Sequence, residues 1–345
     1  MFRGSAKLSK PVLKSERGIA LFLVLWVLAL LTIIAGEFSY AIRTEAKIAG
    51  NFKEETQAYY IATSGAFTAI GELVANEFVP RPLSTAGSEE EPADVWRRFN
   101  VDIPAVPFGE GQFKVEKENE SGKVNLNRAD GVLLKMILNG FELDDADKNV
   151  IVDSIMDWRD KDRLHRANGA EDEYYQSLPE PYRCKNGDFT SAEELLLVRG
   201  VTSGIYYGGL KEMVTVYQDK EIRTPRGKKP AAGPDFNRIN INAASPQMLR
   251  SLPGMTEDIV QKIVEYRKKG DFRSLRDMAV LVGADTYSAL SPYITLRLSP
   301  YYTIKSVGSF RESKNRWGVQ AVVKIDRTLS RGYVIINWID ALEQG

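Results

Sequence analysis

The sequence predicts an α+β fold in which a long N-terminal helix packs on an antiparallel sheet and a large α-helical domain is inserted into the sheet region. Three observations predict it. An uncharged apolar run at 18–36 continues into a helical pattern that contains no proline as far as residue 76. Alternating strand patterns occur near residue 115 and again after residue 301. The block between them, about 127–296, has mainly helical periodicity and internal repeats.

The apolar run has the length of a membrane span. Its nineteen residues, at about 1.5 Å per residue, extend roughly 28 Å, close to the ~30 Å hydrocarbon core of a bilayer. Because a positive flank stays on the cytoplasmic side, everything after Glu37 is predicted to lie across the membrane. That flank contains one acidic residue, Glu16, and five basic residues: Arg3, Lys7, Lys10, Lys14 and Arg17.

A glycine stands immediately before the apolar run. Secretory signals have a small-residue cleavage site after the run, whereas Arg17-Gly18 followed at once by an apolar helix resembles a type IV prepilin leader. That resemblance implies cleavage after Gly18 by a dedicated peptidase and N-methylation of Ile19. A plain single-pass anchor with an incidental Arg-Gly is the alternative, since short motifs often occur by chance. Most pilin-like subunits carry Glu at the fifth mature position, where this chain has Leu23.

The segment after the membrane span continues as an amphipathic helix, which needs a sheet to cover its apolar stripe. Apolar or small residues recur near helical spacing at Ile42, Ala46, Ala49, Phe52, Tyr59, Ala62, Ala66, Ala69, Ile70 and Leu73. Strands are predicted at 112–117, 123–126, 302–310, 317–326 and 333–339. In one of them, Val319, Ala321 and Val323 alternate with polar residues, as in a half-buried strand.

Composition excludes several classes of function. The chain has 345 residues, enough for two domains, and its 46 acidic residues balance its 46 basic ones, which argues against a dedicated nucleic-acid binder. A single cysteine, Cys184, cannot form an internal disulfide and is most simply a small buried hydrophobe. A single histidine, His165, excludes a His-based metal cluster and argues against a Ser-His-Asp site. No nucleophile, oxyanion loop or nucleotide-binding glycine motif accompanies the paired carboxylates, so an enzyme is the least favoured class.

The helical block contains repeats. The segment 123–130 recurs as 238–245, where Ser245 is a natural N-cap and Pro246 a natural first helical residue. Further capped helices, each followed by a glycine, are predicted to begin at Ser191 and at Ser274.

A hairpin in the second copy resembles the helix-hairpin-helix motif. Its sequence is Leu252-Pro253-Gly254-Met255-Thr256, and an amphipathic helix follows. DNA-binding versions hold a phosphate on backbone N–H groups, which gives an alternative function: a membrane-tethered DNA-binding protein of a pilus-like DNA-uptake system, with Lys268 and Lys269 in its basic patch. The other interpretation is that the hairpin only packs helices. We favour it, because the chain is neutral and acids such as Glu257 and Asp258 lie beside the hairpin.

One loop of the helical block is rich in carboxylates. Calcium prefers six to eight oxygen ligands, which acidic loops supply. The spacing differs from an EF-hand, and the residues alone leave two interpretations equally open: a calcium site, or a surface loop salt-bridged by Arg159, Arg163 and Arg166. The candidate metal ligands are Asp157, Asp160, Asp162, Glu171 and Asp172.

The strongest resemblance is carried by the succession of motifs around this loop. The motifs are Asp157-Trp158-Arg159-Asp160-Lys161-Asp162, Asn168-Gly169-Ala170-Glu171-Asp172, Tyr174-Tyr175, Tyr182, Asn186, Glu193-Glu194-Leu195 and Val198-Arg199-Gly200. In this order they resemble the protein K family of the type II (general) secretion system, which are minor pseudopilins. The resemblance runs from Arg17 to roughly Arg267. Lys161 and Arg163 depart from it by bringing positive charge into a loop that is usually more acidic.

The resemblance implies a pilin-like fold and a calcium ion in the acidic loop. It also implies a subunit at the tip of the type II secretion pseudopilus that helps to initiate assembly and protein export across the outer membrane. The missing Glu at Leu23 fits that place, because no subunit lies above it. The implied partners are the minor pseudopilins called proteins I and J, the prepilin peptidase, the inner membrane and secreted proteins, but not nucleic acid. The N-terminus would be cytoplasmic and most of the chain periplasmic.

The expected organisation has five parts. They are a leader at 1–18, a transmembrane segment at 19–37, the first part of the pilin-like body at 38–126, the inserted helical domain at 127–296, and the C-terminal strands of the body at 297–345.

Overall fold

The computed structural model describes residues 17–78, 95–96, 98–99, 102–217, 237–311 and 316–340. The chain divides into two units, Met1–Gln57 and Ala58–Gly345, and each is described by itself. Most of the predicted leader, residues 1–16, falls outside the described residues.

Helix α1 (Arg17–Phe78) is a single helix of 62 residues, which confirms the predicted continuation of the apolar run. By length and composition it is the one helix among the described residues that is long and apolar enough to cross a membrane. In the first unit its side chains are mostly exposed, including large apolar ones such as Phe22, Trp26 and Phe38.

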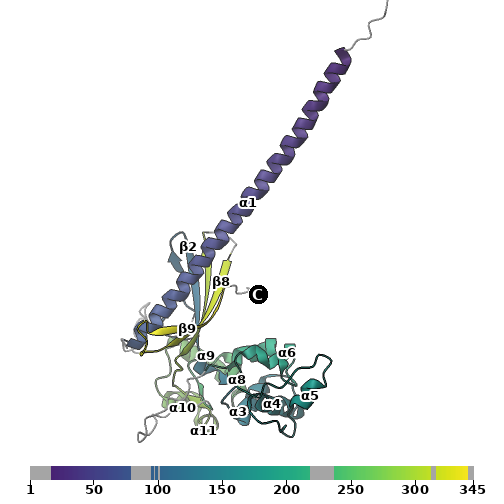
Figure 1. Ribbon diagram of the computed structural model, residues 1–345. Coiled ribbons are helices and arrows are strands. Elements are labelled where there is room, and N and C mark those ends of the chain that lie inside the picture. The colour runs from purple at the N-terminus through teal and green to yellow at the C-terminus, as the bar shows by residue number, and fades with distance from the viewer. Residues whose placement is uncertain are drawn as a thin grey trace, which may run out of the picture. The chain divides into compact units, whose positions relative to one another are not determined.

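The second unit contains a five-stranded sheet in the order β1-β2-β7-β8-β9, and all of its neighbouring strands are antiparallel (Figure 1). Strands β2 and β7 are adjacent in the sheet, and Asn119 pairs with Tyr302. The long helical region therefore leaves the sheet and returns to it between two neighbouring strands. The strands are β1 (Val106–Phe108), β2 (Gly111–Asn119), β7 (Tyr301–Phe310), β8 (Arg316–Ile325) and β9 (Tyr333–Ile339).

Small residues let the last turns of α1 pack closely on this sheet. A Cβ atom on Gly308 would clash with the backbone of Ala58 and Ala62, and one on Gly65 would clash with Ser306 and Phe113. The part of the predicted apolar stripe from Ala62 to Leu73 is buried there, in one core between helix and sheet. The earlier part is exposed: Ile42 is 49% and Phe52 70% exposed. From the helix this core includes Ile61, Ala62, Ala66, Ala69, Ile70 and Leu73.

The helical region has a second, separate core. Its elements fall into two groups. They follow η1 (Glu120–Gly122), which comes directly after β2. The first group contains β3 (Val124–Asn125), α3 (Gly131–Ile137), η2 (Leu138–Gly140), α4 (Asp145–Arg159), α5 (Asp172–Gln176), η3 (Ala192–Leu197), α6 (Ser203–Ile205), η4 (Tyr206–Leu210), α7 (Lys211–Met213) and β4 (Val214–Thr215). The second contains β5 (Ile239–Asn240), α8 (Pro246–Ser251), α9 (Glu257–Lys269), α10 (Leu275–Val282), α11 (Ala284–Leu290) and β6 (Ile294–Thr295).

These groups are two copies of one unit, which we call the first repeat (123–217) and the second repeat (238–297). Each closes with a short parallel strand pair, β3 with β4 and β5 with β6. The segment predicted as a strand at 123–126 therefore pairs inside the first repeat and does not join the antiparallel sheet. Ser245 caps α8 by accepting from the Met248 N–H, as predicted, and Ser274 forms a full capping box with Asp277.

The same buried amide closes both repeats. The Asn127 side chain donates to the Phe189 carbonyl at 2.9 Å and accepts from the Phe189 N–H at 2.7 Å. Asn242 makes the same pair of bonds with Phe272, at 3.0 and 2.9 Å. An arginine repeats as well, because Arg159 and Arg267 each donate to two backbone carbonyls. These carbonyls are those of Leu126 and Ala129 in the first repeat, and of Ile241 and Ala244 in the second.

Candidate metal centre

The acidic loop is an insertion into the first repeat. In the second repeat only residues 268–271 separate Arg267 from Phe272, whereas residues 160–188 separate the equivalent Arg159 and Phe189. Helix α4 ends at Arg159, and Asp160 is its C-cap. From there the chain loops out and returns through α5, which begins at Asp172. All five predicted ligands thus lie in this insertion or on the last turn of α4.

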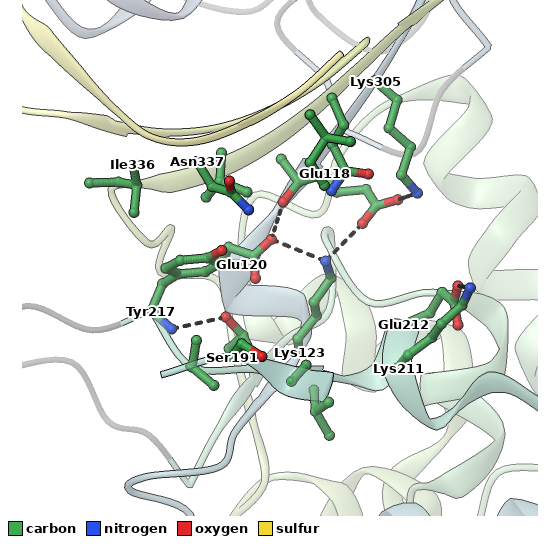
Figure 2. Close-up of a pocket in the computed structure, with 18 of the residues that line it drawn as sticks. Glu118, Glu120, Lys123, Ser191, Lys211, Glu212, Tyr217, Lys305, Ile336 and Asn337 are labelled. Atoms are coloured by element: carbon green, nitrogen blue, oxygen red, sulfur yellow. Dashed lines mark hydrogen bonds and ion pairs between the residues drawn. The ribbon is translucent and has the colours of Figure 1, made fainter. Parts of the chain in front are cut away.

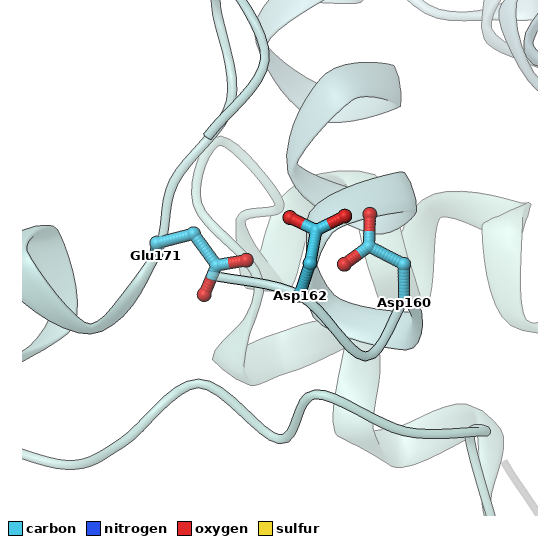
Figure 3. Close-up of side chains that lie close together, drawn as sticks. All are labelled: Asp160, Asp162 and Glu171. Carbon is cyan, nitrogen blue, oxygen red and sulfur yellow. The ribbon is translucent and has the colours of Figure 1, made fainter. Parts of the chain in front are cut away.

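Three of the five carboxylates converge. One oxygen each from Asp160, Asp162 and Glu171 lies within 4.8 Å of the others, and the three side chains point toward a common space (Figure 3). Asp160 is half-buried, Asp162 is exposed and Glu171 is buried. Like charges at this separation repel one another unless a cation or protons lie between them.

Glu171 is the residue that points most directly to a cation. Its side chain is 4% exposed, and neither of its carboxylate oxygens has a hydrogen-bond partner among the described residues. One oxygen of Asp160 is also buried without a partner, while its other oxygen accepts from Arg166 at 2.7 Å. Leaving buried carboxylate oxygens unsatisfied is costly, and hard oxygens of this kind are what calcium binds. The residues present therefore fit a divalent cation.

The electrostatics of the loop agree with this fit. Burial raises the pKa of Glu171, the nearby Cys184 thiol opposes the shift, and the charges of Asp157, Asp160 and Asp172 raise the pKa further. The thiol is a weak donor, and its hydrogen bond is to the Asp157 carbonyl at 3.9 Å, so it leaves the Glu171 oxygens without a partner. Burial and the neighbouring carboxylates therefore disfavour the charged form of Glu171. A bound cation would favour the charged form instead.

Asp157 and Asp172, the other two predicted ligands, have protein partners. Asp157 is fully buried and accepts from the backbone N–H of Arg166 at 3.0 Å and from its guanidinium. Burial raises the pKa of Asp157 above its ordinary value, although the bonds from Arg166 oppose the shift. Asp172 accepts from the Cys184 N–H at 2.9 Å. The structure thus brings three predicted ligands together and gives the other two a role in holding the loop.

Of the three arginines predicted to salt-bridge the loop, Arg166 does so and Arg159 does not. Arg166 bridges Asp157 and Asp160, whereas Arg159 donates to backbone carbonyls of the first repeat. Gly169 is required where the loop crosses Asp157, because a Cβ there would overlap the Asp157 carboxylate. Sequence reasoning did not single out Asn186 as a ligand. Its side-chain oxygen is buried and has no hydrogen-bond partner within the described ranges, and its φ of 48° is left-handed.

The two other predicted sites lie elsewhere. Gly18 and Ile19, the cleavage and methylation positions, are in the first turn of α1, and cleavage there stays a prediction. At the hairpin of the second repeat, Gly254 has the left-handed φ of +73° that such a turn requires. The first turn of α9 that follows carries Glu257 and Asp258, which pair with Arg250 at 2.7 Å and with Lys262 at 2.6 Å.

A long N-terminal helix on an antiparallel sheet, with a helical region inserted between neighbouring strands, defines a pilin-like subunit that carries an additional domain. Residues 104–219 match the family model for protein K of the type II secretion system, and residues 235–295 match a helix-hairpin-helix motif. The resemblance to the type II secretion system protein K family that the sequence predicts is confirmed, and the comparisons support a minor pseudopilin of that system. The α+β fold expected from the sequence is confirmed.

Individual relatives agree with this assignment. Type II secretion system protein K of Aeromonas hydrophila is 29% identical over 268 residues, which cover 72% of this chain and 74% of the relative. The protein of the same name from Pectobacterium carotovorum subsp. carotovorum is 30% identical over 206 residues, 55% of this chain and 60% of the relative. One chain in the crystal structure of the GspK-GspI-GspJ complex from the enterotoxigenic Escherichia coli type 2 secretion system shares the fold. The TM-score is 0.58 at 17% identity, over 87% of this chain and 100% of that one.

Proposed function

We propose that this subunit occupies the tip of the type II secretion pseudopilus, where it helps to start assembly and supports export of proteins across the outer membrane. The observation that carries the proposal is Leu23. If the leader is cut after Gly18, Leu23 takes the fifth mature position, where most pilin-like subunits have Glu. A carboxylate there pairs with a charged neighbour inside the membrane. A subunit without it lacks that contact and ends the filament.

The partners proposed for the tip are the minor pseudopilins called proteins I and J. One support is the fold shared with a chain of the GspK-GspI-GspJ complex. Another is the surface of α1 beyond the membrane span, where large apolar side chains are exposed and offer a helix-packing face. They are Phe38, Ile42, Ile48 and Phe52, which share one side of the helix at about 100° per residue. The proposal includes a cytoplasmic N-terminus in the inner membrane, a periplasmic body, processing by the prepilin peptidase and contact with secreted proteins.

The test is to co-express the full chain with proteins I and J, extract the complex in detergent, and determine its composition by mass spectrometry. We expect one copy of this chain per complex, starting at methylated Ile19. Leu23→Glu restores the missing carboxylate and should allow further subunits to add, so that particles with this chain at internal positions appear. Leu23→Gln is the matched control, similar in size but without charge. Complexes that contain several copies of the unaltered chain would contradict the tip assignment.

We also propose that the acidic loop holds a structural calcium ion. Asp160, Asp162 and Glu171 would be its carboxylate ligands, and the orphaned buried oxygens of Glu171 are the observation that supports this. The ion would supply charge neutralisation and would order the insertion. Other residues of the chain hold the loop: Arg166 pairs with Asp157 and Asp160, and Asp172 accepts from the backbone N–H of Cys184 in the returning segment.

A further inference from the structure

The helical region joins the sheet through two chain segments. Residues 119–123 lead out of β2, and residues 297–301 lead into β7. We call these two segments the junction. A domain on short connections ordinarily moves relative to its support unless a large interface holds it in place. The contacts within and around the junction therefore decide whether the helical region can bend or twist against the sheet.

The buried side chain of Asn119 fastens the two segments of the junction to each other. Its Nδ2 donates to the carbonyl of Ser299 at 2.8 Å and to that of Tyr301 at 3.3 Å. Its Oδ1 accepts from the backbone N–H groups of Ser121 and Ser299, both at 3.0 Å. Because the amide makes all four of its bonds away from water, any movement that separates the segments leaves buried polar groups without partners, which is costly.

The same arrangement closes each repeat. The Oδ1 of Asn125 accepts from the N–H group two residues ahead, and its Nδ2 donates to the Tyr217 carbonyl at 3.0 Å. Asn240 repeats both bonds, with the Arg297 carbonyl as the acceptor at 3.0 Å. Three buried asparagines thus close three chain crossings, one in each repeat and, at Asn119, one around the whole helical region. The junction is fastened in the way that the interior of each repeat is.

A network of charges adds to this fastening (Figure 2). The Lys123 amine lies 2.9 Å from a Glu118 oxygen and 3.0 Å from a Glu120 oxygen, and Lys305 of β7 pairs with Glu118 at 3.0 Å. Glu120 also accepts from the Thr303 hydroxyl at 2.6 Å. Although burial opposes it, the two lysines hold the pKa of Glu118 at about 2, so its carboxylate stays charged at neutral pH. Opening the junction would separate buried charges from their partners.

Each repeat also supports the junction from its own side. In the first repeat, the Tyr217 ring stacks on that of Tyr301, with their centroids 5.9 Å apart. In the second repeat, the backbone of Ala243 lies so close to Gly122 that a Cβ atom there would be 2.3 Å from the Ala243 carbonyl oxygen. Bending toward one repeat is blocked by these contacts, and bending away from it would break them.

We propose that the junction is a rigid coupling, which makes the sheet and the two repeats move as one body. A displacement at α10 in the second repeat then reaches the sheet, and with it the last turns of α1 that pack on the sheet, instead of being absorbed by a hinge. Asn119 is the central fastening, because its one side chain bonds both segments. The coupling does not depend on where the subunit lies in the pseudopilus.

The test measures distances between pairs of spin labels on the full chain in detergent by pulsed electron resonance. Cys184 is first replaced by alanine, so that introduced cysteines carry the labels. One pair spans the junction, from Gln112, exposed on β2, to Val280, which is 81% exposed on α10. The other pair lies within the helical region, from Val132 on α3 to Val280. Each pair should give one narrow distance distribution.

Asn119→Ala should about double the width of the distribution across the junction and leave the pair within the helical region unchanged. Asn139→Ala, at an exposed asparagine of the first repeat, is the matched control and should change neither pair. If Asn119→Ala does not fold, Tyr217→Ala, which removes the ring stacked on Tyr301, takes its place and should widen the same distribution.

Three results would overturn the proposal. The unaltered chain could give a broad or two-peaked distribution across the junction, which would mean that a hinge is present. The variant of the junction could give a distribution as narrow as that of Asn139→Ala, which would mean that the side chain replaced does not set the coupling. Both pairs could broaden together, which would make that side chain a general stabiliser of the helical region.

Discussion

The two repeats of the helical region share a scaffold and differ in what has been inserted into it. The second repeat passes from Arg267 to Phe272 through four residues, 268–271, whereas the first places the whole acidic loop between Arg159 and Phe189. The buried Asn and Arg bonds are the same in both. These bonds form in the second repeat without an insertion, so the acidic loop of the first repeat must be ordered by interactions of its own.

Those interactions are aromatic and electrostatic. Trp158 and Tyr182 both pack on the buried ring of Tyr175, with centroids 5.3 and 5.2 Å from it. Arg199 lies over the Tyr174 ring at 4.6 Å and donates to the Gly169 carbonyl at 3.1 Å. The loop also contains the converging carboxylates of the candidate metal centre. The scaffold should therefore be insensitive to metal, and the loop should depend on it.

The largest expected effect tests whether the scaffold is the same in both repeats. Asn127→Ala and Asn242→Ala each leave a buried backbone N–H and C=O without partners, which costs about 2–4 kcal/mol of the free energy of unfolding. Urea denaturation of the full chain in detergent, followed by tryptophan fluorescence, measures it. Asn139→Ala is the matched control, because that side chain is exposed. A loss at one position without a similar loss at the other would mean that the two repeats are not energetically equivalent.

The next effect tests whether only the loop depends on metal. Calcium at a hundredfold excess over its Kd stabilises a folded state that alone binds it by about 2.7 kcal/mol. Sites of the extracellular kind bind at about 10⁻⁴ to 10⁻³ M, so millimolar calcium is the appropriate range, and magnesium should stabilise less. The measurement is the melting temperature with calcium, with magnesium and with chelator.

Glu171→Gln should remove the calcium response, and Glu173→Gln, on the exposed neighbour two positions away, should keep it. Asn242→Ala should also keep it, because the second repeat lacks the insertion. A chelator that leaves the melting curve unchanged would make the loop a salt-bridged surface, held by Arg166 alone.

A smaller effect compares the two arginines. Arg159→Lys and Arg267→Lys replace a fork that reaches two carbonyls by a single ammonium group, so each should cost about 1–2 kcal/mol. Arg267 is 6% exposed and Arg159 is half-buried, so the loss should be greater in the second repeat. Denaturation curves under the conditions used for the asparagines measure it. Arg238→Lys is the surface comparison, and equal costs at Arg159 and Arg267 would show that burial does not decide the difference.

Much of this architecture could be predicted from the sequence, because local patterns encode it. Proline-free periodicity predicts α1, alternation predicts β8, and Ser245 followed by Pro246 predicts the start of α8. The parallel pairing of β3 with β4 could not be predicted, because two-residue strands are too short to show a period. The sequence also could not show which carboxylates of the acidic loop converge and which pair with protein groups. Whether Asp157 faces Arg166 or a metal depends on where the loop folds back, which the spacing of carboxylates does not encode.

The smallest expected effect concerns DNA, where the two repeats should behave alike. The equivalent helices both begin with acids: α4 has Asp145 and Asp147 in its first turn, and α9 has Glu257 and Asp258. Carboxylates in the first turn repel a phosphate that would bind at the helix N-terminus. The full chain in detergent should therefore bind duplex DNA no more tightly than the non-specific range of about 10⁻⁴ to 10⁻⁶ M at physiological salt. Electrophoretic mobility shift at several salt concentrations measures it.

Replacing Lys268 and Lys269 by glutamine, in the last turn of α9, should change the affinity by less than about tenfold, as two screened surface charges do. Tight, salt-sensitive binding that these two substitutions abolish would give the second repeat a function that the first lacks, and would restore the DNA-uptake interpretation of the hairpin.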